Sequence, residues 1–153
     1  MPTSGDKKAF SVVQVSSLQA RIIQFRLSPD GHWLAYSSTE SGREEVYITH
    51  FPDGSGKWQV SETGGTQPVW RGDTREIYFV GRGSGVHAAD VTISNNELSL
   101  GPVRQLFQIT STGPLGNPLD VTPDGRHFVL ATMPESTPTP LVLVSNWTAE
   151  VGK

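Results

Sequence analysis

Residues 27–36, with the sequence LSPDGHWLAY, combine a tight turn with the start of a β-strand. Pro29 fixes its own φ angle, Asp30 can accept hydrogen bonds from the backbone that follows it, and Gly31 tolerates a positive φ. From Trp33 onward, bulky apolar residues alternate with small or polar ones, as in a strand with one buried face. The segment therefore predicts a turn that leads into a strand.

The same pattern recurs twice further along the chain. Residues 121–130 (VTPDGRHFVL) are a near copy, and residues 70–79 (WRGDTREIYF) are a degenerate copy in which Thr74 replaces the glycine. The aspartates of the three copies are spaced 43 and 51 residues apart. Four short strands in about 40–50 residues are typical of a β-propeller blade.

The whole chain favours strands, because no window has a convincing helical period. We predict an all-β propeller in which residues 21–61, 66–107 and 117–147 form three four-stranded blades, after a disordered lead-in over residues 1–8. A separate strand over residues 10–15 has no place in the first blade, whereas the third blade is one strand short.

Three blades cannot close a ring, since propellers need about four to eight. An open arc would also expose blade faces and sheet edges. We therefore expect a homodimer, in which two chains form one six-bladed ring about a two-fold axis. Residues 10–15 of each chain would supply the outer strand of the partner's third blade. The alternative is that the 153 residues are a piece of a longer propeller protein.

Composition argues against several classes of partner. The net charge is −3 and no basic run occurs, so we expect no nucleic-acid binding. No apolar stretch approaches the ~18 residues of a membrane helix, and residues 1–8 lack the apolar core of a signal peptide. The chain as it stands is expected to be soluble, with no membrane partner, and cytoplasmic if it is produced in this form. Cysteine is absent, which excludes disulfides and thiolate chemistry.

Several segments resemble the repeats of TolB-like, WD40-like propellers. They are residues 28–38 (SPDGHWLAYSS), 41–47 (SGREEVY), 64–68 (GGTQP) and 120–125 (DVTPDG). The sequence is most similar to the propellers at the C-termini of bacterial serine/threonine kinases. The resemblance implies a six- or seven-bladed sensor or interaction module without catalysis of its own. No kinase motif is present, so kinase activity is not implied.

The inner strand of each blade lines the central channel of a propeller. Aligning the three inner strands places Arg26, Val69 and Asp120 in one register and Gln67 in another. We predict that Arg26, Gln67 and Asp120 face the channel and bind a peptide or a small polar ligand. The alternative for Arg26 and Asp120 is a structural ion pair that closes the channel. A second candidate surface is the loop face formed by residues 39–44, 81–85 and 134–140.

The leading hypothesis is thus a non-enzymatic ligand- or protein-binding module that needs no cofactor. The alternative is a metal-dependent, promiscuous hydrolase, since imidazoles can hold Zn²⁺ or a similar divalent metal that activates water. Histidine is atypical of the family repeat at all four positions where it occurs, and no metal-binding spacing connects them. The candidate ligands are His32, His50, His87 and His127.

Overall fold

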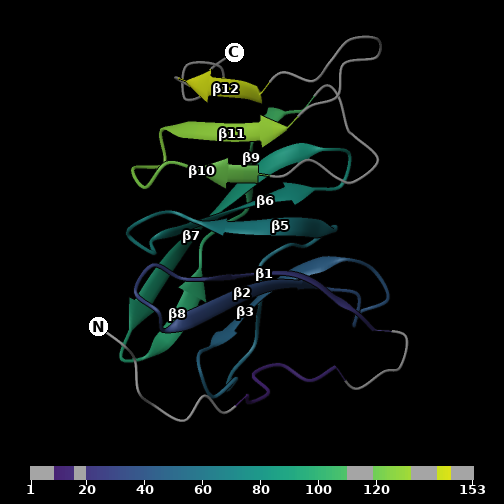
Figure 1. Cartoon of the computed structure of the whole chain (residues 1–153), viewed down its shortest axis with the longest axis vertical. Helices are drawn as coiled ribbons and strands as arrows, with labels where there is room; N and C mark the ends of the chain where they lie inside the picture. Colours follow the sequence, from purple (N-terminus) through teal and green to yellow (C-terminus); the bar gives the residue numbers. More distant parts are fainter. Residues whose placement is uncertain (1–8, 16–19, 110–118, 132–140, 146–153) are drawn as a thin grey trace.

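The computed structural model describes residues 9–15, 20–109, 119–131 and 141–145. Within these residues the secondary structure consists of β-strands alone, which form three antiparallel sheets stacked along the long axis of the molecule (Figure 1). The all-β prediction is therefore confirmed. No helix in this described part of the chain could cross a lipid bilayer.

Each sheet follows the chain in order, and the strands match the predicted ones to within a few residues. The first sheet contains β1 (Ile22–Leu27), β2 (Trp33–Ser38), β3 (Glu45–His50) and β4 (Trp58–Gln59). The second contains β5 (Gly65–Trp70), β6 (Glu76–Gly81), β7 (Gly85–Ser94) and β9 (Arg104–Gln108). The third contains β10 (Leu119–Val121), β11 (His127–Ala131) and β12 (Leu141–Ser145).

The repeated turns have the same internal structure in the first and third sheets. In residues 28–33 and in residues 122–127, the aspartate accepts one hydrogen bond from the hydroxyl two residues before it. It accepts another from the N–H two residues after it. These distances are 2.5 and 3.1 Å in the first turn and 2.5 and 3.0 Å in the last. Gly31 and Gly125 both have positive φ angles, as the sequence predicts.

One strand was not expected. β7 extends past the second sheet and pairs with β8 (Glu97–Leu100) in a hairpin. Asn95 and Asn96, at its tip, have φ angles of 52° and 63°, which suit a two-residue hairpin turn. Leu98 joins the core between the first two sheets. Four residues give too short a pattern for the sequence to reveal this strand.

The predicted strand over residues 10–15 is wrong for the single chain, because residues 9–15 contain no strand. This segment passes the turn after β3 instead. The rings of Phe10 and Phe51 lie 6.2 Å apart, and the Val12 carbonyl lies against Gly54. A turn offers no row of free N–H and C=O groups, so the segment has no ladder to join there.

Two apolar cores lie between successive sheets. The first packs Trp33, Ile48 and neighbouring residues of the first sheet against Trp70 and Phe79 of the second. The other packs further residues of the second sheet against β10 and β11. The indole N–H of Trp70 also donates to the Arg26 carbonyl oxygen at 3.1 Å, which ties β5 to β1. Each inner strand is thus held by the sheet that follows or precedes it.

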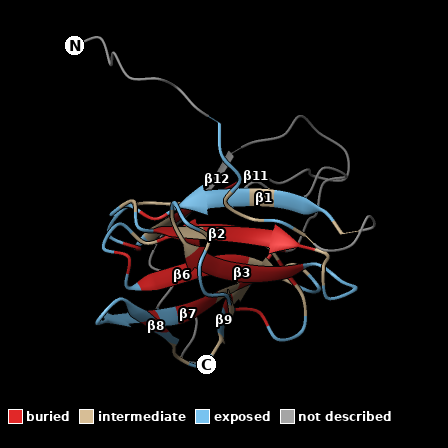
Figure 2. Ribbon diagram, turned by 90° about the horizontal axis from the view of Figure 1, so that it is seen from below, coloured by how far each residue is buried: buried red, intermediate tan, exposed pale blue. Residues whose placement is uncertain are grey.

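The first strand of the first sheet is different, because β1 is largely exposed while β2 and β3 beside it are buried (Figure 2). Phe25 and Leu27 on β1 are 64% and 47% exposed. At the equivalent repeat positions, Leu119 of β10 is 4% exposed and Trp70 of β5 is 6% exposed. The repeat positions whose apolar side chains are buried in β5 and β10 therefore carry exposed apolar side chains in β1.

Candidate functional site

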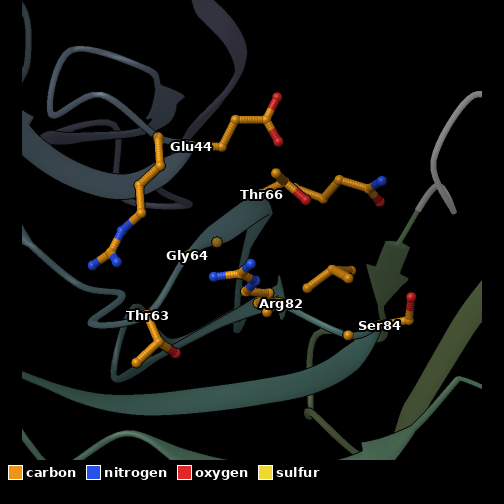
Figure 3. A pocket seen from close by; sticks show the side chains of 12 residues that line it. Glu44, Thr63, Gly64, Thr66, Arg82 and Ser84 are labelled. Carbon is orange, nitrogen blue, oxygen red and sulfur yellow. The ribbon is translucent and has the colours of Figure 1, made fainter.

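A hollow of about 510 Å³ lies at one end of the first and second sheets (Figure 3). Its walls are the end of the loop before β3, the connection from β4 to β5, and the hairpin between β6 and β7. Two of these walls coincide with the predicted loop face at residues 39–44 and 81–85. The third predicted segment, residues 134–140, lies outside the described residues.

The floor of the hollow is braced by the buried carboxylate of Glu45. Its oxygens accept hydrogen bonds from the Ser61 hydroxyl and, at 3.1 Å, from the Gly64 N–H. Arg43 forms an ion pair with the same carboxylate and donates to the Glu62 carbonyl oxygen at 2.7 Å. These contacts join the loop before β3 to the connection between the sheets, so the hollow has a preformed base.

The buried residue Gln67 lines the hollow. It is only 8% exposed, and its side-chain oxygen has no hydrogen-bond partner among the described residues. Its φ angle of 56° is unusual for a residue other than glycine, and the strand register shifts between Thr66 and Val69. Leaving a buried polar group unpaired costs about 1–3 kcal/mol. Strain and an unmade hydrogen bond therefore coincide at one residue that faces a hollow.

Two opposite charges also line the hollow. Arg82, in the hairpin between β6 and β7, and Glu44, in the loop before β3, lie on either side of Gly64. A Cβ atom at Gly64 would lie 3.6 Å from Arg82 Cβ and 3.7 Å from the Glu44 carbonyl oxygen. In Figure 3 the Arg82 guanidinium points towards Gly64 while the Glu44 carboxylate points away from Arg82. Neither side chain forms an ion pair or hydrogen bond within the described part of the chain.

The predicted channel residues lie on three different sheets, Arg26 on the first, Gln67 on the second and Asp120 on the third. Arg26 and Asp120 occupy equivalent places, since they pair across the strands with Ala35 and Val129 at matching repeat positions. Both are exposed, and no ion pair joins them to each other or to another described residue. Gln67 instead lines the hollow at the end of β5. The structure therefore separates Gln67 from the two charged candidates.

The four histidines lie in separate surroundings. His50 stacks on Trp33 with ring centroids 4.3 Å apart. Its two ring nitrogens lie 3.0 Å from the Ser55 hydroxyl and 3.0 Å from the Asn96 carbonyl oxygen. The ring of His87 stacks on Phe79 at 5.4 Å. His32 and His127 follow two different turns. No group of three or more potential metal ligands occurs in the ranges that the structure describes.

Arg82 and Glu44 were not singled out from the sequence as site residues. Each lay within a segment that was expected to form the loop face, but the two are far apart in the chain. The glycines around Arg82 suggested a plain connecting loop. Only the packing of the first sheet against the second brings Glu44, Gly64 and Arg82 to one hollow.

Solved structures share the propeller-type fold of this chain at low sequence identity. A protein from Agrobacterium tumefaciens described as a putative TolB has a TM-score of 0.56 and 18% identity over 78% of this chain and 40% of its own. A gluconolactonase from Xanthomonas campestris has a TM-score of 0.60 and 13% identity over 87% of this chain and 47% of its own. An oligogalacturonate lyase from Vibrio parahaemolyticus has a TM-score of 0.54 and 15% identity over 76% and 32%, respectively.

The match is one of fold alone, because all three identities are low. This chain spans less than half the length of each of these proteins. Neither a protein-family model nor a curated protein matches the sequence. The predicted TolB-like propeller architecture is therefore confirmed at the level of fold, and the similarity to the propellers of bacterial kinases stays a prediction.

Proposed function

We propose that the chain is a non-enzymatic, ligand-binding propeller module that works as a pair of chains closing a six-bladed ring. The observation that carries the assembly is the open apolar face of β1. Phe25 and Leu27 are exposed where the equivalent Leu119 and Trp70 are buried against a preceding sheet. The repeat favours a second copy of the chain as the partner of this surface, because the third sheet of one copy could pack against the first sheet of the other. That contact would resemble the one between the second and third sheets within a chain.

The opposite end of the chain supports the same arrangement. On the third sheet, Val129 is 37% exposed and its cross-strand neighbour Asp120 is also exposed. The matching residues of the second sheet, Val69 and Tyr78, are buried against β10 and β11. Exposed positions thus lie on β1 at one end of the stack and on β10 and β11 at the other. A two-fold axis would pack the first sheet of each chain against the third sheet of its partner.

Residues 10–15 favour the proposed strand exchange. The third sheet has three strands in the described residues, so its β12 edge has no fourth partner there. Residues 10–15 lie beside the first sheet without forming a strand (Figure 1). In the proposed ring, the partner's third sheet lies next to this first sheet. The segment would gain there the ladder of hydrogen bonds that it lacks in one chain.

Binding is favoured over hydrolysis by the composition of the hollow. Among the described residues, the Gln67 amide oxygen is buried without a partner and the charges of Glu44 and Arg82 are unpaired, which suits recognition of a polar molecule. The histidines that the hydrolase alternative needs are dispersed, and the rings of His50 and His87 are engaged in other contacts. The hollow therefore supports a binding site rather than a metal-activated water.

The assembly is tested by light scattering at micromolar concentration. We expect the mass of two 153-residue chains for the wild type and of one chain for Phe25→Glu. Ile93→Glu is the matched control, because Ile93 is a comparably exposed apolar residue on the β7–β8 arm. A single-chain mass for the wild type would reject the ring. Metal analysis of the same sample discriminates the functions, since one bound divalent ion per chain would favour the hydrolase.

A further inference from the structure

We infer that the hollow between the first and second sheets binds a zwitterionic amino acid or short peptide. The ammonium group would bind Glu44, the carboxylate would bind Arg82, and a ligand N–H would reach the side-chain amide of Gln67. This inference rests on the proposed binding function and assigns a ligand class to the same hollow.

The first observation in favour of this ligand class is the pair of opposite charges on Arg82 and Glu44. Arg82 and Glu44 line the hollow from different elements, and the Glu44 carboxylate points away from Arg82, so the two charges are not paired to each other (Figure 3). The second arginine of the hollow, Arg43, is already bound to Glu45 and to the Glu62 carbonyl oxygen. Arg82 is therefore the arginine of the hollow that remains available for a ligand carboxylate, with which a guanidinium forms strong charge-assisted hydrogen bonds.

Gly64 lies between the base of the Arg82 side chain and the backbone of Glu44. Its φ angle of 111° is one that residues with a Cβ rarely adopt. A Cβ there would also come into van der Waals contact with Arg82 and Glu44. The backbone conformation thus favours glycine at the point where the two chain segments that carry Arg82 and Glu44 come together.

Gln67 provides a second, independent observation in favour of this site. Its amide oxygen is buried at the wall of the hollow with no partner in the part of the chain that the structure describes, and its backbone has a positive φ angle. Sparsely populated conformations of this kind cluster at binding sites, where the surrounding structure holds them in place. A small turn about the last side-chain bond would let the oxygen accept an N–H from a ligand. The energetic cost of the unpaired oxygen would then be recovered on binding.

The dimensions of the hollow suit a small ligand. Its volume of about 510 Å³ falls within the usual range of ~300–1,000 Å³ for small-molecule sites. A dipeptide presents one ammonium, one carboxylate and one N–H between them, which matches the three groups on the walls. Because both charged side chains are exposed, we expect binding to weaken as salt concentration rises.

The test uses titration calorimetry with L-alanyl-L-alanine as the probe and the intact chain. N-acetyl-alanyl-alanine lacks the ammonium, and alanyl-alanine amide lacks the carboxylate. We expect the wild type to bind the free dipeptide at millimolar concentration or below, and each blocked peptide at least ~10-fold more weakly, the equivalent of one charge-assisted contact.

Variants assign each charge to its residue. Arg82→Gln should bind the free dipeptide and its amide equally, and Glu44→Gln should no longer distinguish the free dipeptide from its acetylated form. Gln67→Ala should weaken all three peptides. Arg75→Gln is the matched control, because Arg75 is an exposed arginine outside the hollow and should change nothing.

The inference is overturned if the free dipeptide does not bind, or if the charge variants still distinguish the peptides as the wild type does. If a blocked peptide binds as well as the free one and Gln67→Ala weakens both, the hollow is a binding site but the ligand is not a zwitterion. The ring can fail separately, because its test is the mass in solution and involves none of these residues.

Discussion

The first and second repeat turns share one backbone but differ in their side chains. Residues 28–33 and 71–76 are each closed by a hydrogen bond from the first N–H to the last carbonyl oxygen, at 2.8 and 2.9 Å. In the first turn, the Ser28 hydroxyl caps the N–H of Trp33 at 2.9 Å. In the second, Arg71 stands in its place and its guanidinium binds Asp73 at 2.8 Å and Glu76 at 3.3 Å.

The difference shows which parts of the repeat are needed for the turn and which are free to change. The aspartate keeps its bond to the N–H two residues later, at 3.1 Å in both turns. The last position is buried in both, but Trp33 packs on His50 and Trp58 whereas Glu76 binds Arg71, Arg104 and the Tyr78 hydroxyl. A polar network therefore replaces an aromatic cluster at one repeat position.

The largest expected effects come from removing the buried side chain at this repeat position in either turn. Glu76→Ala leaves Arg71, Arg104 and the buried Tyr78 hydroxyl without their shared partner, so we expect a loss of about 3 kcal/mol in the free energy of unfolding. Trp33→Ala, at the equivalent position, should cost a similar ~3–5 kcal/mol through lost packing. Urea denaturation measures both.

Glu97→Ala serves as the control for Glu76→Ala, because Glu97 is an exposed acid at the start of β8. It should change the free energy of unfolding by less than about 0.5 kcal/mol. A loss below 1 kcal/mol for Glu76→Ala would mean that the polar network does not stabilise the second turn in the way that the aromatic cluster stabilises the first.

A smaller effect is expected at the fourth turn position. Thr74 has a φ angle of 62° where Gly31 has 76°, and a β-branched residue is strained in this conformation. Thr74→Gly should raise the free energy of unfolding by about 1 kcal/mol, and Gly31→Ala should lower it by about as much. A Cβ at Gly31 would contact nothing within 4 Å, so its cost is conformational. Equal stability of both variants and the wild type, by urea denaturation, would contradict this.

The smallest expected effect is on the pH dependence of stability. It concerns the third turn, which begins with the hydroxyl of Thr122, whereas the second turn begins with Arg71 and has no hydroxyl there. The hydroxyl of Thr122 and then the N–H of Arg126 hold the pKa of Asp124 below its usual value. A carboxyl with a lowered folded-state pKa stabilises the fold above its unfolded pKa, and this contribution is lost as pH falls through the folded value. The loss therefore begins below about pH 4.

Thr122→Val removes the hydroxyl, so the pKa of Asp124 should rise towards its usual value. An NMR titration of the Asp124 side chain in both proteins measures the change. An unchanged pKa would show that the backbone N–H alone sets it.

Much of the local structure follows from the sequence. Alternating side chains and the three aspartate turns located β1, β2 and β11 to within a residue or two, because both signals depend on neighbouring residues only. β8 escaped notice, since four residues give too short a pattern and its burial depends on the long β7 arm. Residues 10–15 were expected to be a strand from their composition, but a strand also needs a partner edge.

The candidate site was less accessible to sequence reasoning. Gln67 and two of the predicted loop segments line the hollow, and their part in binding stays a prediction. Glu44 and Arg82 carry no motif, and their pairing on either side of Gly64 depends on how two sheets pack.

The sequence by itself determined the turns and the alternation of faces, since dihedral preferences and the two-residue period of a strand act locally. The tertiary structure decided which faces are covered. Phe25 and Trp70 both carry large apolar rings on inner strands, yet one is exposed and the other buried. The reason is physical: burial depends on whether another sheet lies against the face, and that is a property of the packed molecule and its partners.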